Sequence, residues 1–198
     1  MFFKSRAAAL CGWFHRLQTR ALAALSSPRF FYLIIGLLAF QALWIALSAQ
    51  FPQAFDEDFH FGLIQLHAQQ WLPFFAHQPA GAEVHGAVVR DPSYLYHYLL
   101  SFPYRLLSVW TPSLAVQVIA LRLINIGMFI GGLFVYRALL TRLGLSRRLI
   151  HTILLFFVLT PAMPLLAANI NYDNLVFLLT AALLLYVVRF IQALENGQ

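Results

Sequence analysis

Charged residues are scarce in this sequence, and cysteine is almost absent. Only 10% of its 198 residues are charged and 61% are hydrophobic, whereas a water-soluble domain has about 25% charged residues. The lone cysteine, Cys11, excludes an internal disulfide and a cysteine-cluster metal site. The apolar stretch before Cys11 is too short for a lipoprotein signal peptide, so we interpret this thiol as inert. The composition predicts an integral membrane protein.

Acidic residues are scarcer than basic ones. The sequence has 7 Asp and Glu against 13 Lys and Arg, which gives a net charge of +6. The basic residues are spread along the chain beside apolar segments, as membrane orientation signals are. Many of the 19 Phe, 8 Tyr and 4 Trp lie near the ends of apolar runs, where aromatic rings favour the lipid headgroup region. We therefore predict membrane lipid, and not nucleic acid, as a partner.

Several apolar stretches are long enough to cross a bilayer as helices, which takes about 20 residues. Four such stretches cover residues 30–51, 117–140, 149–168 and 174–191. A fifth stretch, residues 93–110, is interrupted by a histidine, a proline and an arginine, so hydropathy alone does not decide whether it crosses. The predicted fold is an all-α integral membrane domain over residues 29–191, with about four transmembrane helices.

Basic residues predict the orientation of these helices. Five of them precede the first span, namely Lys4, Arg6, Arg16, Arg20 and Arg29. The positive-inside rule therefore places the N-terminus in the cytoplasm of a multi-pass protein of the cell membrane. If residues 93–110 also crossed, Arg142, Arg147 and Arg148 would lie outside, against the same rule. We therefore predict that residues 93–110 lie along the outer surface.

This topology divides the rest of the chain. Residues 52–116 become an external region with interfacial helices, residues 169–173 a short external loop, and residues 192–198 a cytoplasmic tail. Residues 1–28 are predicted to form an amphipathic helix on the cytoplasmic surface, with arginines available to anionic lipid. Six of the seven acids then face outward, and only Glu195 lies inside.

The densest group of acids follows the first span directly. A helix is predicted from Asp56, because acids in a first turn favour the helix dipole. At about 100° per residue, Asp56, His60 and His67 share one helix face, whereas Glu57 and Asp58 point elsewhere. A carboxylate with two imidazoles suits a general base or metal ligation. The alternative is an acidic helix start with histidines on a wet, membrane-surface helix.

Two more charged residues lie near the same predicted surface. The short loop at residues 169–173 brings Asp173 to the membrane level of Asp56, although Asp173 could equally cap the fourth span. Arg122 lies one to two turns inside the second span, where an arginine needs a partner or an aqueous pocket. It could pair with a carboxylate, hold a lipid phosphate or extend to the headgroups.

Aromatic residues fill the segment at residues 94–98, which holds three tyrosines and His97. These rings could stack on a sugar or on a prenyl chain. The alternative is an ordinary aromatic belt at the membrane interface.

The order of these motifs resembles the N-terminal part of the GT-C membrane glycosyltransferases, which include protein O-mannosyltransferases and aminoarabinose transferases. Residues 55–62, Phe-Asp-Glu-Asp-Phe-His-Phe-Gly, are similar to the acidic pair and His-Phe-Gly of the mannosyltransferase form. A proline-and-tyrosine segment follows at residues 91–96, Asp-Pro-Ser-Tyr-Leu-Tyr, then a span with Arg122 near its start and a second external acid, Asp173. Where the family often has His-Pro-Pro, this chain has Arg-Asp-Pro at residues 90–92.

The resemblance implies transfer of a sugar from a polyprenyl-phosphate donor to an acceptor on the non-cytoplasmic face. Asp56 would be the catalytic base, with Glu57 and Asp173 orienting the acceptor. Some members of the family use a divalent cation, which Asp56 and Asp173 would bind here. His60 and Arg122 would contact the donor phosphate. The remaining substrate contacts would come from His67, Tyr94, Tyr96 and His97.

Two other functions stay open. Family members have several hundred residues and about twice as many spans, so the resemblance implies a truncated enzyme or one half of a split enzyme. The chain could then be a non-catalytic membrane subunit that assembles with a complementary subunit. A small transporter could use Arg122 and the histidines for ions, but the acids gather at one surface rather than in pairs inside a span.

Overall fold

The computed structural model describes residues 13, 18–20, 22–88 and 94–197. Within them the chain forms helices and no strand, which confirms the all-α prediction. The elements are α2 (Pro28–Ser48), α3 (Glu57–Ala68), the 3-10 helix η1 (Glu83–His85), α4 (Leu95–Trp110), α5 (Leu114–Arg142), α6 (Arg147–Leu159), α7 (Ala162–Ala167) and α8 (Asp173–Glu195). The prediction for residues 1–28 falls largely outside the described residues, as do Cys11 and residues 89–93.

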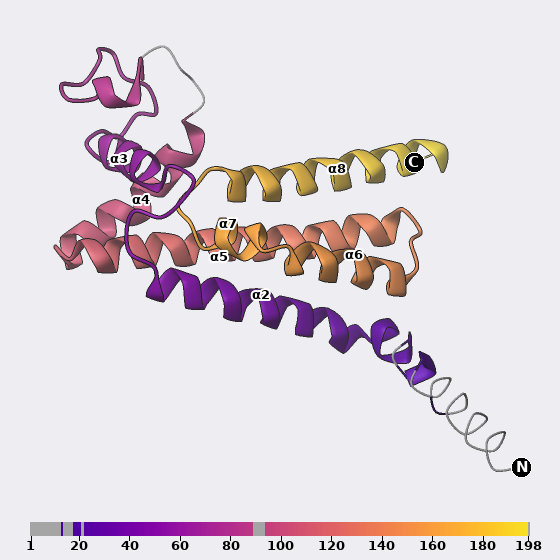
Figure 1. The fold of residues 1–198 in the computed structure, drawn as a ribbon. Helices are drawn as coiled ribbons and strands as arrows, with labels where there is room; N and C mark the ends of the chain where they lie inside the picture. The colour runs from indigo at the N-terminus through magenta and orange to yellow at the C-terminus, as the bar shows by residue number, and fades with distance from the viewer. Residues whose placement is uncertain (1–12, 14–17, 21, 89–93, 198) are drawn as a thin grey trace, which may run out of the picture.

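Figure 1 shows α2, α5, α6 with α7, and α8 running side by side as a bundle. The helices α3 and α4 pack together at one end, where α5 and α8 begin. We call this the acidic end, because Asp56, Glu57, Asp58 and Asp173 lie there. The start of α2 and the end of α8 lie at the opposite end of the bundle.

Three helices, α2, α5 and α8, are long and apolar enough to cross a membrane, which indicates a multi-pass membrane protein. The prediction of about four spans is not confirmed. The third predicted stretch, residues 149–168, is divided between α6 and α7. Thr160 has an extended backbone, because the residue before a proline is driven away from the helical conformation and Pro161 follows. The type of membrane and the position of the N-terminus stay predictions.

The core of the bundle lies between α2, α5 and α6. One face of α2 is fully buried at a spacing of three and four residues, namely Phe31, Ile34, Leu38, Ala42 and Ala46. It packs against Ile126, Phe129 and Leu133 of α5 and against α6. On the other side of α5, a side chain at Gly132 would collide with the Phe177 ring of α8, so this glycine lets the two helices approach closely.

At the acidic end, Arg105 of α4 holds the end of α3. Its Nε donates to the Ala68 carbonyl at 2.9 Å and its Nη2 to the His67 carbonyl at 2.7 Å, with a further bond from Nη2 to the Gln70 carbonyl. The carbonyls of His67 and Ala68 belong to the last turn of α3, where intrahelical donors run out. The guanidinium also lies 4.3 Å above the ring of Trp71. Arg105 therefore fixes the packing of α4 against α3.

Candidate functional site

The site is built on a buried ion pair between Glu57, the first residue of α3, and Arg122 of α5. Arg122 Nε donates to Glu57 Oε1 at 2.8 Å, and Nη2 donates to Oε2 at 2.7 Å. This is the paired geometry in which arginine binds a carboxylate most strongly. The exposed fraction of the two side chains is 2% for Arg122 and 0% for Glu57. It is the only ion pair between residues that the structure describes.

The remaining donors of Arg122 hold the end of α2. Its Nη1 donates to the carbonyls of Ala46 at 3.0 Å and Ala49 at 2.9 Å, and its Nη2 also donates to the Gln50 carbonyl at 3.4 Å. All five N–H groups of the guanidinium therefore have protein acceptors. The carbonyls at the end of α2 would otherwise lack donors.

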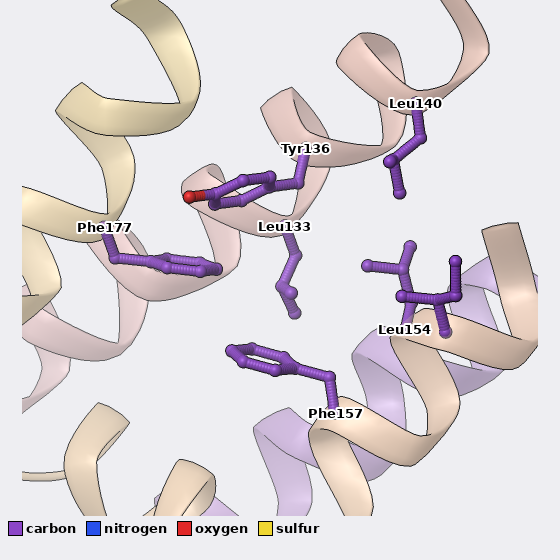
Figure 2. Close-up of a pocket in the computed structure, with 7 residues that line it drawn as sticks. Leu133, Tyr136, Leu140, Leu154, Phe157 and Phe177 are labelled. Carbon is purple, nitrogen blue, oxygen red and sulfur yellow. The ribbon is translucent and has the colours of Figure 1, made fainter. Parts of the chain in front are cut away.

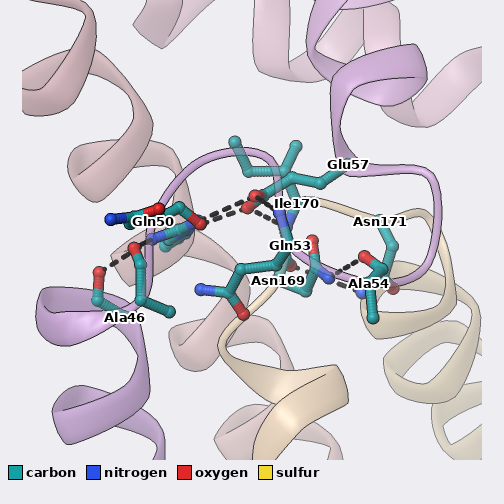
Figure 3. Close-up of polar contacts among 10 residues, drawn as sticks. Ala46, Gln50, Gln53, Ala54, Glu57, Asn169, Ile170 and Asn171 are labelled. Atoms are coloured by element: carbon teal, nitrogen blue, oxygen red, sulfur yellow. Dashed lines mark hydrogen bonds and ion pairs between the residues drawn. The ribbon is translucent and has the colours of Figure 1, made fainter.

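Glu57 ties two further loops to the same point, as Figure 3 shows. Its Oε2 accepts a hydrogen bond from the backbone N–H of Gln53 at 2.8 Å, and its Oε1 accepts one from the N–H of Ile170 at 3.4 Å. The loop before α8 also reaches back, because the side-chain amide of Asn169 donates to the Ala54 carbonyl. One carboxylate thus joins α3, α5, the loop after α2 and the loop before α8.

This arrangement corrects the predicted helix face. Glu57 was expected to point away from the important face, but it is the carboxylate that turns inward. The reason is that α3 begins at Glu57, while Asp56 precedes the helix in a left-handed conformation. The predicted face of Asp56, His60 and His67 required Asp56 to be helical. Of the partners considered for Arg122, the structure shows the carboxylate, that of Glu57.

Asp56 is exposed and held in an uncommon backbone conformation. Its φ is +52°, and that of Phe55 before it is +60°. Two consecutive non-glycine residues in the left-handed region cost on the order of 1–3 kcal/mol each, and such strain gathers at functional sites. The bonds of Gln53 and Ala54 on one side and of Glu57 on the other hold this conformation in place. The Asp56 side chain makes no capping bond to α3.

Three carboxylates surround His60, the first histidine of α3. The charges of Asp56, Asp173 and Asp58 raise the pKa of His60, but its burial outweighs them and lowers this pKa overall. Asp173 is the first residue of α8 and Tyr172 its N-cap, so Asp173 favours the helix dipole without capping the helix. Two predicted site acids from distant parts of the chain thus act on one imidazole.

His60 belongs to a larger group of histidines at the acidic end, which comprises His60 and His67 of α3, His85 of η1 and His97 of α4. A ring nitrogen of His60, Nδ1, lies 3.0 Å from Nε2 of His97 in a hydrogen bond. Burial lowers the pKa of His97 to about 3, helped by the three other histidines. Burial, helped by the charge of Arg105, lowers the pKa of His67 to about 4. These imidazoles are neutral at pH 7.

The predicted substrate-binding residues lie mostly inside the protein. Tyr96 is buried, and its hydroxyl donates to Asn125 Oδ1 at 2.9 Å, an atom that also accepts from Asn174 at 3.0 Å. His67 and His97 are buried as well, while Tyr94 is half-buried. Sequence reasoning missed this buried amide network and missed His85, because neither lies in a recognisable motif.

No group of three or more His, Cys, Asp or Glu side chains within the described residues is arranged to hold a metal ion, so a cation at Asp56 and Asp173 stays a prediction.

An apolar pocket of about 300 Å³ lies between α5, α6 and α8. Figure 2 shows Leu133, Tyr136 and Phe177 among the side chains that border it. None of its lining residues is a predicted site residue.

Comparison with protein-family models, with curated proteins and with solved structures finds no match to this chain.

Proposed function

We propose that this chain is a membrane glycosyltransferase module of the GT-C type, which transfers a sugar from a polyprenyl-phosphate donor to an acceptor at the acidic end. One observation carries the proposal. Asp56 is exposed on a left-handed backbone, and its charge and that of Asp173 both act on His60. A carboxylate on a backbone held in one conformation, with a second acid acting on the same imidazole, is suited to the role of a general base.

In the proposed reaction Asp56 accepts the proton of an acceptor hydroxyl. The hydroxyl oxygen bonds to the anomeric carbon of the sugar while the bond from that carbon to the phosphate oxygen breaks. Polyprenyl phosphate leaves with the electron pair. In this proposal Asp173 orients the acceptor and His60 contacts the leaving phosphate. Glu57 and Arg122 act as positioning residues, because their bonds to each other and to the nearby backbone fix the segment that holds Asp56.

The apolar pocket between α5, α6 and α8 supports a lipid-linked donor. Its walls are leucine, isoleucine and aromatic side chains, the lining expected for an isoprenoid or acyl chain. Two of the three helices around the pocket, α5 and α8, are long and apolar enough to cross a membrane.

The test is sugar transfer by membranes that contain the full chain, supplied with radiolabelled polyprenyl-phosphate hexoses. Asp56→Asn keeps the size of the side chain and removes the base, so we expect transfer to fall by about 100-fold or more. Asp58→Asn is the matched control, because Asp58 is an exposed acid only two residues from Asp56, and this variant is expected to keep most of the transfer. Undiminished transfer by Asp56→Asn would exclude Asp56 as the base.

A second candidate function is a non-catalytic membrane subunit, and the packing of α8 favours it. Only 11% of the most apolar stretch of α8 is buried, against 44% for α5. Large apolar side chains of α8 such as Leu183, Tyr186 and Phe190 are exposed and would face lipid or a partner helix. Crosslinking in native membranes distinguishes the two candidate functions. A non-catalytic subunit yields a defined complex through α8, whereas a self-sufficient transferase module yields none.

A further inference from the structure

Arginines gather at the end of the bundle opposite to the acidic end. We call it the arginine end and define it by Arg137 and Arg142 of α5, Arg147 and Arg148 of α6, and Arg189 of α8. Within the described part of the chain none of these arginines takes part in an ion pair. The one described acid on the neighbouring helix ends is Glu195, which is exposed. The positive charge of this end is therefore not neutralised by the protein.

The arginines line two cavities that share Arg137 and Thr141. The first has a volume of about 230 Å³ and is also lined by Arg147 and His151. The second has a volume of about 300 Å³ and is also lined by Arg142 and Arg189. The first cavity thus brings together guanidinium groups of α5 and α6. The second brings together guanidinium groups of α5 and α8.

Contacts with the start of α2 hold this end in place. The guanidinium of Arg137 lies 4.4 Å above the Phe31 ring, and Arg148 Nε donates to Ser26 Oγ at 2.7 Å. His151 is fully buried, and its Nδ1 donates to the Leu25 carbonyl at 2.7 Å. Its other ring nitrogen, Nε2, has no protein partner among the described residues, although His151 lines the first cavity. A residue that lines the first cavity beside Arg137 and Arg147 therefore has an unsatisfied ring nitrogen.

We propose that these cavities bind the phosphate of an anionic phospholipid headgroup. Guanidinium groups match phosphate oxygens with paired hydrogen bonds, and basic pockets between membrane helices favour acidic headgroups. A lipid is favoured over free phosphate because apolar side chains line part of each cavity, Leu145 and Ile150 in the first and Phe134 in the second. They also lie at the end of α5 and beside the end of α8, two helices that can cross a membrane. The site is independent of the proposed sugar transfer.

The experiment uses the purified full chain in a neutral detergent and native mass spectrometry to measure lipid binding. Phosphatidylglycerol is expected to bind about tenfold more tightly than zwitterionic phosphatidylcholine, because charge-assisted bonds to its phosphate are not opposed by a headgroup cation. Arg137→Gln is expected to weaken phosphatidylglycerol binding by about tenfold. Arg29→Gln is the matched control, since Arg29 is exposed at the start of α2 and lines neither cavity.

Two further arms keep the test decisive. Arg189→Gln changes an exposed residue of the second cavity, so it tests the site without disturbing the core if Arg137→Gln folds poorly. Inorganic phosphate and glycerol phosphate serve as competitors, and neither is expected to displace the lipid at equal concentration. Equal binding of the two lipids, an equal effect of the Arg29 and Arg137 variants, or displacement by free phosphate would each overturn the proposal.

Discussion

The two ends of the bundle use arginine in opposite ways. At the acidic end Arg122 is buried, pairs with Glu57 and has every N–H group engaged by the protein. At the arginine end Arg142 and Arg189 are exposed and have no ion-pair partner among the described residues. A buried charge must be paired, whereas a charge at a surface stays free to bind a ligand. The same residue type therefore holds the fold together at one end and is available for recognition at the other.

The largest expected effect comes from breaking the pair at the acidic end. Arg122→Leu leaves the Glu57 carboxylate buried without its partner, which costs about 3–5 kcal/mol of folding free energy. Because the loops before α3 and α8 depend on Glu57, we expect a large fall in the melting temperature in detergent and loss of any sugar transfer. The measurement is thermal unfolding monitored by fluorescence-detected size exclusion.

Controls from both ends sharpen this prediction. Arg142→Leu removes an exposed arginine of the same helix and should change the free energy of unfolding by about 0.5 kcal/mol or less. Glu57→Gln combined with Arg122→Leu removes both charges and should recover part of the lost stability. If Arg122→Leu and Arg142→Leu lowered stability equally, the contrast between the two ends would be wrong.

A second prediction uses the histidines, which are concentrated at the acidic end. The pKa values of His67 and His97 are lowered to about 4 and about 3 in the folded protein, mainly by burial. The unfolded chain binds protons on these groups below about pH 6.5. As the pH falls from about 6.5 toward 4, the unfolded state therefore takes up more protons than the folded state, and stability falls. Between pH 6.5 and pH 5 the two histidines together should lower the free energy of unfolding by about 3 kcal/mol.

Hydrogen exchange at pH 7 and pH 5, corrected for the intrinsic rates, measures where this loss occurs. Amides of α3 and α4 should lose protection at pH 5, while those of the core segment of α5 around Phe129 and Leu133 should not. The double variant His67→Gln with His97→Gln should show a smaller dependence on pH. Equal loosening of both regions would argue against a local effect of the histidines.

Much of the fold could be predicted from hydropathy, because α2, α5 and α8 are continuous apolar runs. The break between α6 and α7 could not be predicted in this way, since a hydropathy window averages over Thr160 and Pro161. The proline was visible in the sequence, and its effect on the preceding residue is the physical reason for the break.

The sequence singled out charged residues of the acidic end but not their pairings. Arg122 and Asp173 were singled out because charges near apolar spans require an explanation, and Glu57 through the resemblance to a family with an acidic pair. The predicted face was wrong for Asp56, since Phe55 and Asp56 are left-handed and a helical projection applies only from Glu57 onward. The carbonyls that accept from Arg122 belong to the end of α2, and no local pattern indicates such a tertiary contact.

The last prediction concerns Arg105, which is less buried than Arg122 but, unlike Arg142, is bonded to the protein through its guanidinium. It is half-buried, and it bonds to backbone carbonyls at the end of α3 rather than to a carboxylate. Arg105→Gln should cost about 1–2 kcal/mol, since charge-assisted bonds to neutral carbonyls are lost but no buried charge is left unpaired. Thermal unfolding should therefore place this variant between Arg122→Leu and Arg142→Leu. A loss as large as that of Arg122→Leu would show that the packing of α3 on α4, rather than the buried ion pair, limits the stability of the acidic end.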